Sequence, residues 1–193
     1  MNARVVSVQV GVSRPLTVGG RRVLSAIGKT PVQGAVPVGP LGLDGDEQAD
    51  PSVHGGLSKA VYAYPVEHLP DWQRWRREAG VCLFDDALPF GFVGENLSTE
   101  GLLEGEVWIG DQWALGDLLL RVTAPREPCY KFNAVTGLRD AGRRMVEGRC
   151  CGWYLSVVRP GTVQAGAAIT VQPGPRAMSI AEAFLAKRFK HMR

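Results

Sequence analysis

Glycine and proline recur so often in this chain that its regular elements are expected to be short. Of the 193 residues, 24 are glycine and 13 are proline, close to a fifth of the total. Because both residues interrupt helices and strands and favour turns, the pattern predicts many short strands and argues against a helical bundle. The length is that of a single domain, and 45% hydrophobic residues are enough to bury a core without disulfides or a structural metal.

Charge, hydropathy and cysteine usage exclude several classes of protein. The net charge of +3 is too small to indicate a nucleic-acid-binding protein. No uninterrupted run of about 18 apolar residues occurs, and the N-terminus lacks the apolar stretch of a signal peptide, so neither a membrane span nor secretion is expected. The spacing of the four cysteines matches neither a disulfide framework nor a zinc site, which is typical of a reducing, cytoplasmic location.

Short apolar runs bounded by turn residues, the first of which alternates with Ser and Gln, predict a mainly β fold with a minor α component. Strands are expected over 4–13, within 22–33, and over 60–64, 94–97, 107–115, 118–123, 153–159 and 168–172. Helices are expected over 65–79, within 130–147, and after the capping box that Ser179 and Glu182 form near the end of the chain. Residues 34–56 show no periodic pattern and are expected to form a long functional loop.

The string His54-Gly55-Gly56-Leu-Ser-Lys59 combines groups that bind anions. The paired glycines allow the backbone to approach a ligand closely, and Lys59 supplies a positive charge for a phosphate. His54 is suited to proton transfer near neutral pH. The spacing is not that of a Walker loop, and an ordinary glycine turn is the simpler interpretation.

An acidic run precedes this string. Asp44, Asp46 and Asp50 suggest calcium binding, but the sixth and twelfth positions counted from Asp44 are not the glycine and glutamate that an EF-hand needs. We therefore expect a solvated loop whose aspartates cap their own backbone.

Of the four cysteines, Cys129 has the surroundings that best suit a nucleophile or a metal ligand. Two prolines stiffen the chain ahead of it, and the cations Arg126 and Lys131 flank it. Neighbouring cations favour the thiolate, which is both a nucleophile and a ligand for soft metals. A buried structural cysteine is the alternative, and Cys82 and the Cys150-Cys151 pair fit that interpretation.

Two further features leave more than one interpretation open. A cysteine hydrolase would use Cys129 with His54 and either Asn96 or Asn133, whereas the absence of a GxSxG string disfavours a serine hydrolase. The string Gly-Glu-Asn-Leu-Ser over 94–98 places Glu95 and Asn96 between strand-like segments. It fits either a hairpin turn or polar groups directed into a pocket.

Four strings together resemble one known family. They are GLDGD at 42–46, VHGG at 53–56 with KAVY at 59–62, FVGENL at 92–97, and PREPCYK at 125–131. In this order they resemble the MOSC domain, which is named after the C-terminal domain of molybdenum cofactor sulfurase, and in particular its stand-alone YiiM-like branch. The resemblance implies a β-barrel-like domain over 1–175 with a few short helices, followed by a short basic helical tail over 176–193.

The resemblance also implies a cofactor and the residues that hold it. Members of the family bind a molybdopterin-type molybdenum cofactor, and characterised members reduce N-hydroxylated compounds such as hydroxylamine-type base analogues. The family's molybdenum-ligating cysteine corresponds to Cys129, and His54 is the expected proton donor. The remaining cofactor-binding residues are expected to be the cradle around the phosphate and the groups that line the pocket, namely Gly55, Gly56, Lys59, Arg126, Lys131, Glu95, Asn96 and Asn133.

The expected partners are a small-molecule substrate and an external flavin- or ferredoxin-type electron donor. The donor is implied because the chain has no iron–sulfur cysteine set and no dinucleotide fingerprint. The basic run over 187–190 is expected to be a solvated helix end or a contact for an acidic redox partner. Formation of a homodimer is left open. The alternative function is a persulfide carrier, or a protein that binds and delivers the cofactor, using the same cysteine.

Overall fold

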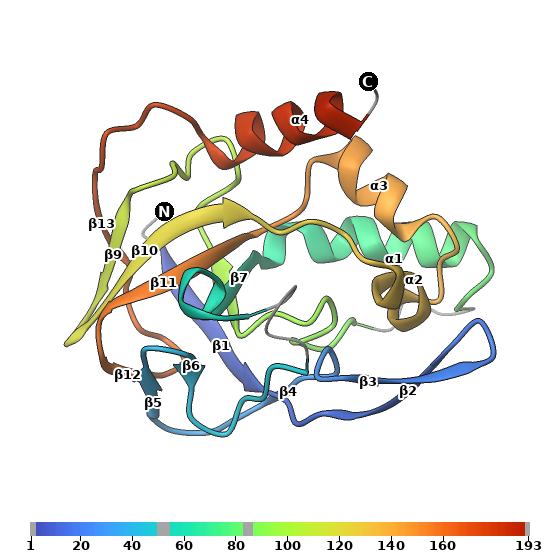
Figure 1. Cartoon of the computed structure of the whole chain (residues 1–193), viewed down its shortest axis with the longest axis horizontal. Helices are drawn as coiled ribbons and strands as arrows, with labels where there is room; N and C mark the ends of the chain where they lie inside the picture. The colour runs from blue at the N-terminus through green and yellow to red at the C-terminus, as the bar shows by residue number, and fades with distance from the viewer. Residues whose placement is uncertain (1–2, 50–54, 83–86, 192–193) are drawn as a thin grey trace.

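A computed structural model describes residues 3–49, 55–82 and 87–191 (Figure 1). Within them, eight strands form one curled sheet in the order β13-β9-β10-β11-β7-β8-β1-β4. Neighbouring strands are antiparallel except β7 and β8, which are parallel. The bounds of these strands are β1 (Arg4–Val10), β4 (Thr30–Pro31), β7 (Val61–Pro65), β8 (Leu97–Glu100), β9 (Gln112–Leu115), β10 (Leu118–Pro125), β11 (Trp153–Arg159) and β13 (Thr170–Gln172).

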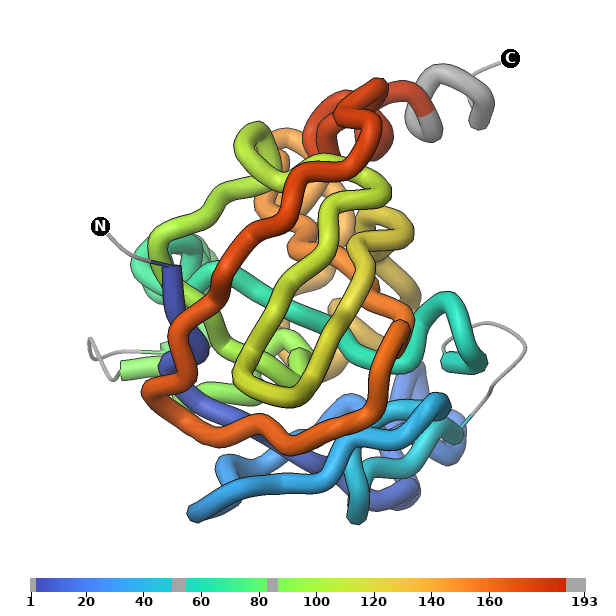
Figure 2. Tube along the Cα trace, turned by 90° about the vertical axis from the view of Figure 1, so that its left-hand side faces the viewer, coloured from blue at the N-terminus to red at the C-terminus, as the bar shows by residue number. Residues whose placement is uncertain are grey.

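The sheet curls until its two ends approach one another. The N–H of Val5 donates to the carbonyl of Ala167 at 2.9 Å, and the N–H of Ile169 donates to the carbonyl of Ala3 at 2.9 Å. These bonds place the segment that leads into β13 beside the start of β1 (Figure 2). The result is a half-barrel, so the predicted mainly β, barrel-like fold with a few short helices is confirmed.

Two small sheets flank the half-barrel. One has the order β12-β5-β6, from β12 (Gly161–Val163), β5 (Val36–Gly39) and β6 (Gly42–Leu43). The other is the hairpin of β2 (Arg14–Val18) and β3 (Arg21–Ser25), which runs along the lower right of Figure 1. Gly19 and Gly20 both have positive φ, as the tight turn of such a hairpin requires. The long loop predicted over 34–56 is therefore wrong in its first half, where β5 and β6 are too short to show an alternating pattern.

Helices α1, α2 and α3 lie at the right of the sheet in Figure 1, away from β9 and β13, and α4 runs along the top of the molecule. The helix predicted over 65–79 is split, because β7 extends to Pro65 and a 3-10 turn precedes α1, whose first turn accommodates Pro70. The single helix expected within 130–147 is two helices, separated where Gly137 adopts a left-handed conformation. The bounds are η1 (Leu57–Lys59), η2 (Val66–His68), α1 (Leu69–Glu78), α2 (Tyr130–Thr136), α3 (Ala141–Gly148) and α4 (Ile180–His191).

The capping box at the start of α4 is confirmed. The N–H of Ser179 donates to the carboxylate of Glu182 at 2.8 Å, and the N–H of Glu182 donates to the Ser179 hydroxyl oxygen at 3.2 Å. Ile180 and Phe184 are buried, so the first turns of α4 belong to the core. Among the residues described, no helix is both long and apolar enough to cross a membrane.

Buried aromatic rings join the helices to the sheet. The ring of Trp72 in α1 meets that of Phe132 in α2 edge-on, with centroids 5.2 Å apart. The indole N–H of Trp72 donates to the hydroxyl of Tyr64 at 2.6 Å, and that hydroxyl donates to the carbonyl of Cys150 at 3.2 Å. These contacts hold α2 against β7, and α2 begins directly after Cys129. The core therefore fixes the position of the cysteine that the sequence singles out.

Candidate functional site

One cavity brings together most of the predicted site residues. It has a volume of about 680 Å³, including the part of its mouth that is open to solvent. Its wall is built from segments far apart in the sequence, around residues 25–29, 46–49, 55–62, 94–96, 126–131 and 154. Six of the predicted residues lie on this wall, namely Gly55, Lys59, Asn96, Arg126, Cys129 and Lys131.

Cys129 reaches the cavity because β10 ends just before it. β10 is paired with β11 as far as Pro125, and the chain then leaves the sheet and enters α2. Cys129 has an extended backbone at the N-cap of α2, and its carbonyl accepts a hydrogen bond from the N–H of Phe132 at 2.9 Å. Its side chain is half-buried, whereas Cys150 and Cys151 are buried in the core as free thiols. Cys129 is thus the cysteine on the cavity wall.

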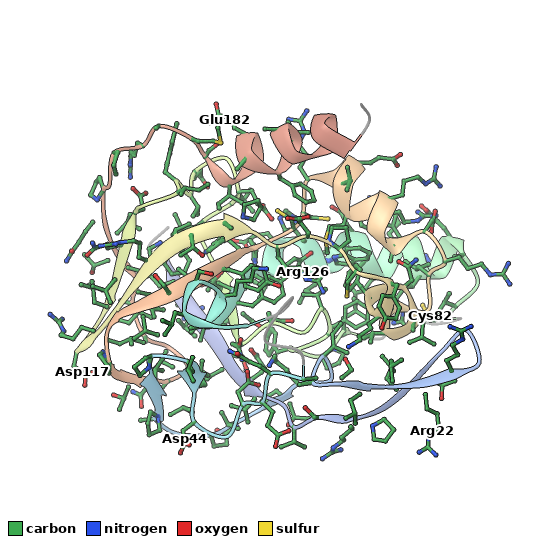
Figure 3. The ribbon with its side chains drawn as sticks, viewed as in Figure 1. Arg22, Asp44, Cys82, Asp117, Arg126 and Glu182 are labelled. Carbon is green, nitrogen blue, oxygen red and sulfur yellow. The ribbon has the colours of Figure 1, made fainter. Side chains whose placement is uncertain are left out.

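Arg126 is a buried cation held between aromatic rings. It is 4% exposed, and its guanidinium carbon lies 4.7 Å from the ring centroid of Phe132 and 5.5 Å from that of Tyr62. Figure 3 shows it near the centre of the molecule, where the sheet meets the helices. Burial acts to lower the pKa of Arg126, but neighbouring Tyr62, Tyr154 and Cys129 raise it above its usual range, so the group stays charged.

No carboxylate in the described part of the chain forms an ion pair with Arg126. A buried charge is stable only with a compensating partner. Cys129 is one of the neighbouring groups that could supply one from within the chain, as a thiolate. An anionic ligand in the cavity would supply another. The guanidinium therefore favours negative charge at the position of Cys129.

A buried polar network forms another part of the wall. The ammonium group of Lys29 forms an ion pair with Asp46, and the two side chains are 8% and 7% exposed. The other Asp46 oxygen accepts a hydrogen bond from the amide nitrogen of Asn96 at 2.8 Å, and the carbonyl oxygen of that amide accepts one from the N–H of Tyr62 at 3.1 Å. Burial lowers the pKa of Lys29, while Asp46 and Glu95 oppose that shift.

The sequence did not identify Lys29 as a site residue, and the prediction for Asp46 is wrong. The expectation that Asp46 caps a solvated loop is wrong, because its carboxylate is buried and bonded to Lys29, Asn96 and the N–H of Gly11. Asp44, from the same acidic run, does lie exposed at the bottom edge of Figure 3. No local pattern marks Lys29, because its partner is 17 residues away.

The cavity wall carries more positive than negative charge. Its cations are Lys29, Lys59, Arg126 and Lys131, and its acids are Asp46 and Glu47. The ammonium of Lys59 lies 5.6 Å from the ring centroid of Tyr154, and that of Lys131 donates to the carbonyl of Leu24 at 2.8 Å. An excess of cations in a concave, partly desolvated site favours an anionic ligand.

Position 55 requires glycine because of its backbone conformation and its close neighbours. A Cβ on Gly55 would lie 2.1 Å from the side-chain oxygen of Gln48, and its φ of 142° is one that residues with side chains rarely adopt. That Gln48 oxygen accepts a hydrogen bond from the N–H of Gly56 at 2.9 Å. Gly55 lines the cavity, but Gly56 lies outside the lining and its N–H is already bonded, which does not match the cradle expected of it.

Two residues expected to line the pocket do not line it. The carboxylate of Glu95 accepts hydrogen bonds from the N–H of Gly91 at 2.7 Å, the N–H of Val93 at 3.1 Å and the hydroxyl of Ser98 at 2.8 Å. It is 1% exposed and fastens the loop ahead of β8. Burial raises its pKa, against the pull of these hydrogen bonds.

Asn133 is the second of these residues. Its amide nitrogen donates to the carbonyl of Arg139 at 2.7 Å, and its amide oxygen accepts from the N–H of Gly142 at 3.1 Å. It therefore joins α2 to α3, and it is not among the residues that line the cavity. His54, the expected proton donor, lies outside the described residues, and so do the side chains of the basic run over 187–190.

Comparison with known proteins places this site in a family. The sequence model of the MOSC domain matches residues 50–170. Protein YiiM of Escherichia coli (strain K12) is 42% identical over 143 residues, which is 74% of this chain and 62% of that protein. The chain thus spans less than two thirds of the length of that relative. A protein named "Reductase" from Gibberella moniliformis is 36% identical over 157 residues, 81% of this chain and 27% of that protein.

The fold agrees with the sequence match. The crystal structure of YiiM from Geobacillus stearothermophilus superposes with a TM-score of 0.75 at 30% sequence identity. The superposition covers 99% of this chain and 86% of that one. Sequence and fold therefore identify the same group of relatives.

Proposed function

Because the chain belongs to the MOSC domain family, we propose that it binds a molybdenum cofactor in this cavity and reduces N-hydroxylated compounds there. MOSC domains are associated with the molybdenum cofactor, and the relative from Gibberella moniliformis is named a reductase. The observation that carries the proposal is the pairing of Cys129 with Arg126. A thiol on the cavity wall lies next to a buried guanidinium that no described carboxylate neutralises.

The residues of the cavity fit a cofactor of this kind. A molybdopterin brings its own sulfur ligands and a phosphate, so the protein has to add one soft ligand and a set of cations. Among the described residues, no group of three His, Cys, Asp or Glu side chains could hold a bare metal ion. Cys129 supplies a single soft ligand instead, and Lys59, Arg126 and Lys131 supply charge for the phosphate.

The reaction consumes two electrons and two protons for each N–O bond that it cleaves. The N-hydroxylated substrate R–NHOH gives the amine R–NH₂ and water. When bound, the cofactor supplies the two-electron reduction, and an external flavin- or ferredoxin-type protein restores the electrons. The chain itself has to hold the substrate and deliver the protons.

Lys29 is the group in the described cavity that is best placed to deliver a proton. Its ammonium lies on the wall with a lowered pKa, and Asp46 holds it in position. A lowered pKa makes Lys29 a stronger acid than an ordinary lysine and lets it exchange protons closer to neutral pH. His54 stays a second candidate for this role. Ala26 and Ile27, which also line the cavity, offer apolar contact to a small planar substrate.

The first experiment measures molybdenum and pterin in protein from a host that makes the cofactor. Cys129→Ser is compared with Cys82→Ser, because Cys82 is also half-buried but lies outside the cavity wall. We expect near-stoichiometric molybdenum in the unaltered protein and in Cys82→Ser, and little in Cys129→Ser. Loaded protein is then assayed for reduction of an N-hydroxylated purine with reduced methyl viologen, a dye that supplies electrons without a protein partner.

Three outcomes would contradict the proposal. Full molybdenum occupancy in Cys129→Ser would show that this thiol is not the ligand. Loaded protein that turns over no N-hydroxylated substrate would favour cofactor delivery. Folded protein that binds neither molybdenum nor pterin would favour persulfide transfer on Cys129, which a sulfur-labelling experiment would then detect.

A further inference from the structure

We propose that the exposed face of the β2–β3 hairpin is the docking surface for an acidic electron-donor protein. The inference rests on the proposed function, because the reduction needs electrons from outside the chain. The hairpin leads directly into the cavity wall, since Ser25, the last residue of β3, lines it together with Ala26. A protein seated on the hairpin would therefore lie next to the segment that builds this part of the cavity wall.

The two faces of the hairpin differ in burial. Paired residues share a face, and the register pairs Pro15 with Leu24 and Thr17 with Arg22. All four of these residues are exposed, and Leu24 is 61% exposed. The opposite face, which carries Leu16 and Val23, is half-buried. The hairpin thus turns a face that carries the apolar pair Pro15 and Leu24 toward solvent, and Figure 3 shows Arg22 directed away from the body of the molecule.

The charged residues of the hairpin and of the chain around it are all positive. The first 43 residues contain five arginine or lysine residues, and every aspartate and glutamate of the chain lies at position 44 or later. Arg14, Arg21 and Arg22 are exposed on the hairpin, and no ion pair in the described part of the chain involves them. By the register, Arg22 shares the face of Leu24, whereas Arg14 and Arg21 belong to the face of Leu16 and Val23 and are exposed at the two ends of the hairpin. Three exposed guanidinium groups on one hairpin, together with the apolar pair Pro15 and Leu24, complement a surface that is acidic with an apolar patch.

The same surface continues to the cysteine. The ammonium of Lys131 donates to the backbone carbonyl of Leu24, which ties the end of the hairpin to the first turn of α2. Tyr130, between Cys129 and Lys131, is 60% exposed. The exposed residues Leu24 and Tyr130 are therefore close to this bond, since Leu24 accepts it and Tyr130 precedes its donor in the chain. A donor that covers both would bring its own redox group close to Cys129.

An acidic protein fits the surface better than a polyanion does. Nucleic acids and anionic membranes are recognised chiefly through their phosphates, and such sites carry denser positive charge than three arginines. Leu24 and Pro15 on this face suit the mixed apolar and charged contact of a protein interface. Electrostatic attraction of this kind raises the rate of encounter and depends strongly on salt.

The test compares a protein donor with a dye that needs no docking. Arg21→Glu/Arg22→Glu reverses the charge of the hairpin, and Arg121→Glu/Arg159→Glu makes the same change in charge on exposed residues of β10 and β11. Those strand ends lie across the molecule from the hairpin in Figure 1. Each variant is assayed for N-hydroxypurine reduction with reduced methyl viologen and with a reduced flavodoxin, a small acidic flavin protein. Binding of the oxidised flavodoxin is measured separately by calorimetry at low and high salt.

We expect the hairpin variant to keep the dye-driven rate but to bind flavodoxin about tenfold more weakly and to raise the KM for it, with a flatter salt dependence. The control variant should match the unaltered protein, and Leu24→Ser should weaken binding without changing its salt dependence. Equal flavodoxin affinity in all the proteins would overturn the inference. So would tighter binding of an oligonucleotide or of anionic vesicles that depends on the same arginines. If the unaltered protein does not reduce the N-hydroxypurine even with the dye, the proposed function is contradicted instead. The calorimetry would still decide whether the hairpin binds flavodoxin.

Discussion

The ammonium group of Lys29 and the carboxylate of Asp46 form an ion pair inside the cavity, although 17 residues separate them along the chain. Lys29 follows the hairpin that ends at Ser25, and Asp46 follows the short strand β6. Both side chains are almost fully buried, so each depends on the other for charge compensation. Together with Asn96 they hold three separate segments of the chain around the ligand space.

Asp46→Asn should destabilise the protein, because it leaves the ammonium of Lys29 buried without a negative partner. We expect a loss of about 3 kcal/mol in the free energy of unfolding near neutral pH. Asp44→Asn is the matched control, because that carboxylate is exposed and should change stability little. Urea unfolding followed by tryptophan fluorescence measures both.

The loss in the free energy of unfolding that Asp46→Asn causes should become smaller as the pH rises. Without Asp46, the pKa of Lys29 in the folded state falls further below its value in the unfolded state. The unfolded state then binds more protons over the interval between the two pKa values, so stability increases with pH there. A deficit that is the same at about pH 7 and about pH 9.5 would show that Lys29 is not the group responsible.

The four cysteines should differ sharply in reactivity toward alkylating reagents. Burial raises the pKa of Cys150 to about 12, and it raises the pKa of Cys151 strongly, so both stay protonated near neutral pH. Cys129 lies on the cavity wall beside Arg126 and should be alkylated first, with Cys82 next. Mass spectrometry of peptides after a brief exposure of the native protein to iodoacetamide measures the order. Labelling of Cys150 as fast as Cys82 would contradict the burial described above.

In Arg126→Lys, the lysine should not support cofactor binding as arginine does. The guanidinium lies between the rings of Phe132 and Tyr62, where a planar cation stacks and a compact ammonium does not. We expect about tenfold weaker retention of the cofactor, measured as molybdenum remaining after dialysis, with the fold preserved by circular dichroism. Arg121→Lys, on an exposed position of β10, is the control. Equal retention in both variants would mean that charge alone is sufficient at position 126.

Gly55→Ala should destabilise the cavity wall through two separable effects. The new Cβ would collide with the side chain of Gln48, and the backbone at φ 142° disfavours any residue except glycine. Together we expect a cost of about 2–4 kcal/mol. Adding Gln48→Ala should recover part of this loss, because it removes the collision but not the backbone strain. A double variant no more stable than Gly55→Ala would place the whole cost in the backbone. Thermal unfolding of the single and double variants measures the recovery.

Local patterns in the sequence determined the class of fold and several of its elements. Runs rich in apolar and β-branched residues predicted β10 and β11, and the capping box predicted the start of α4, because each depends only on residues close together in the chain. The stiff, cationic setting of Cys129 likewise singled it out. Strands β5, β6 and β12 escaped prediction, since two to four residues are too few to show a period.

Only the tertiary structure decided which of these groups meet. Glu95 and Asn133 have side chains of the kind found in binding sites, but both form hydrogen bonds with neighbouring loops and helices instead. The sequence does not show where a side chain points. Asp46 belongs to an acidic run, yet the fold buries it against Lys29 and Asn96. The cavity is made by strands paired across large sequence separations. Its chemistry therefore follows from long-range contacts, whose partners no local pattern specifies.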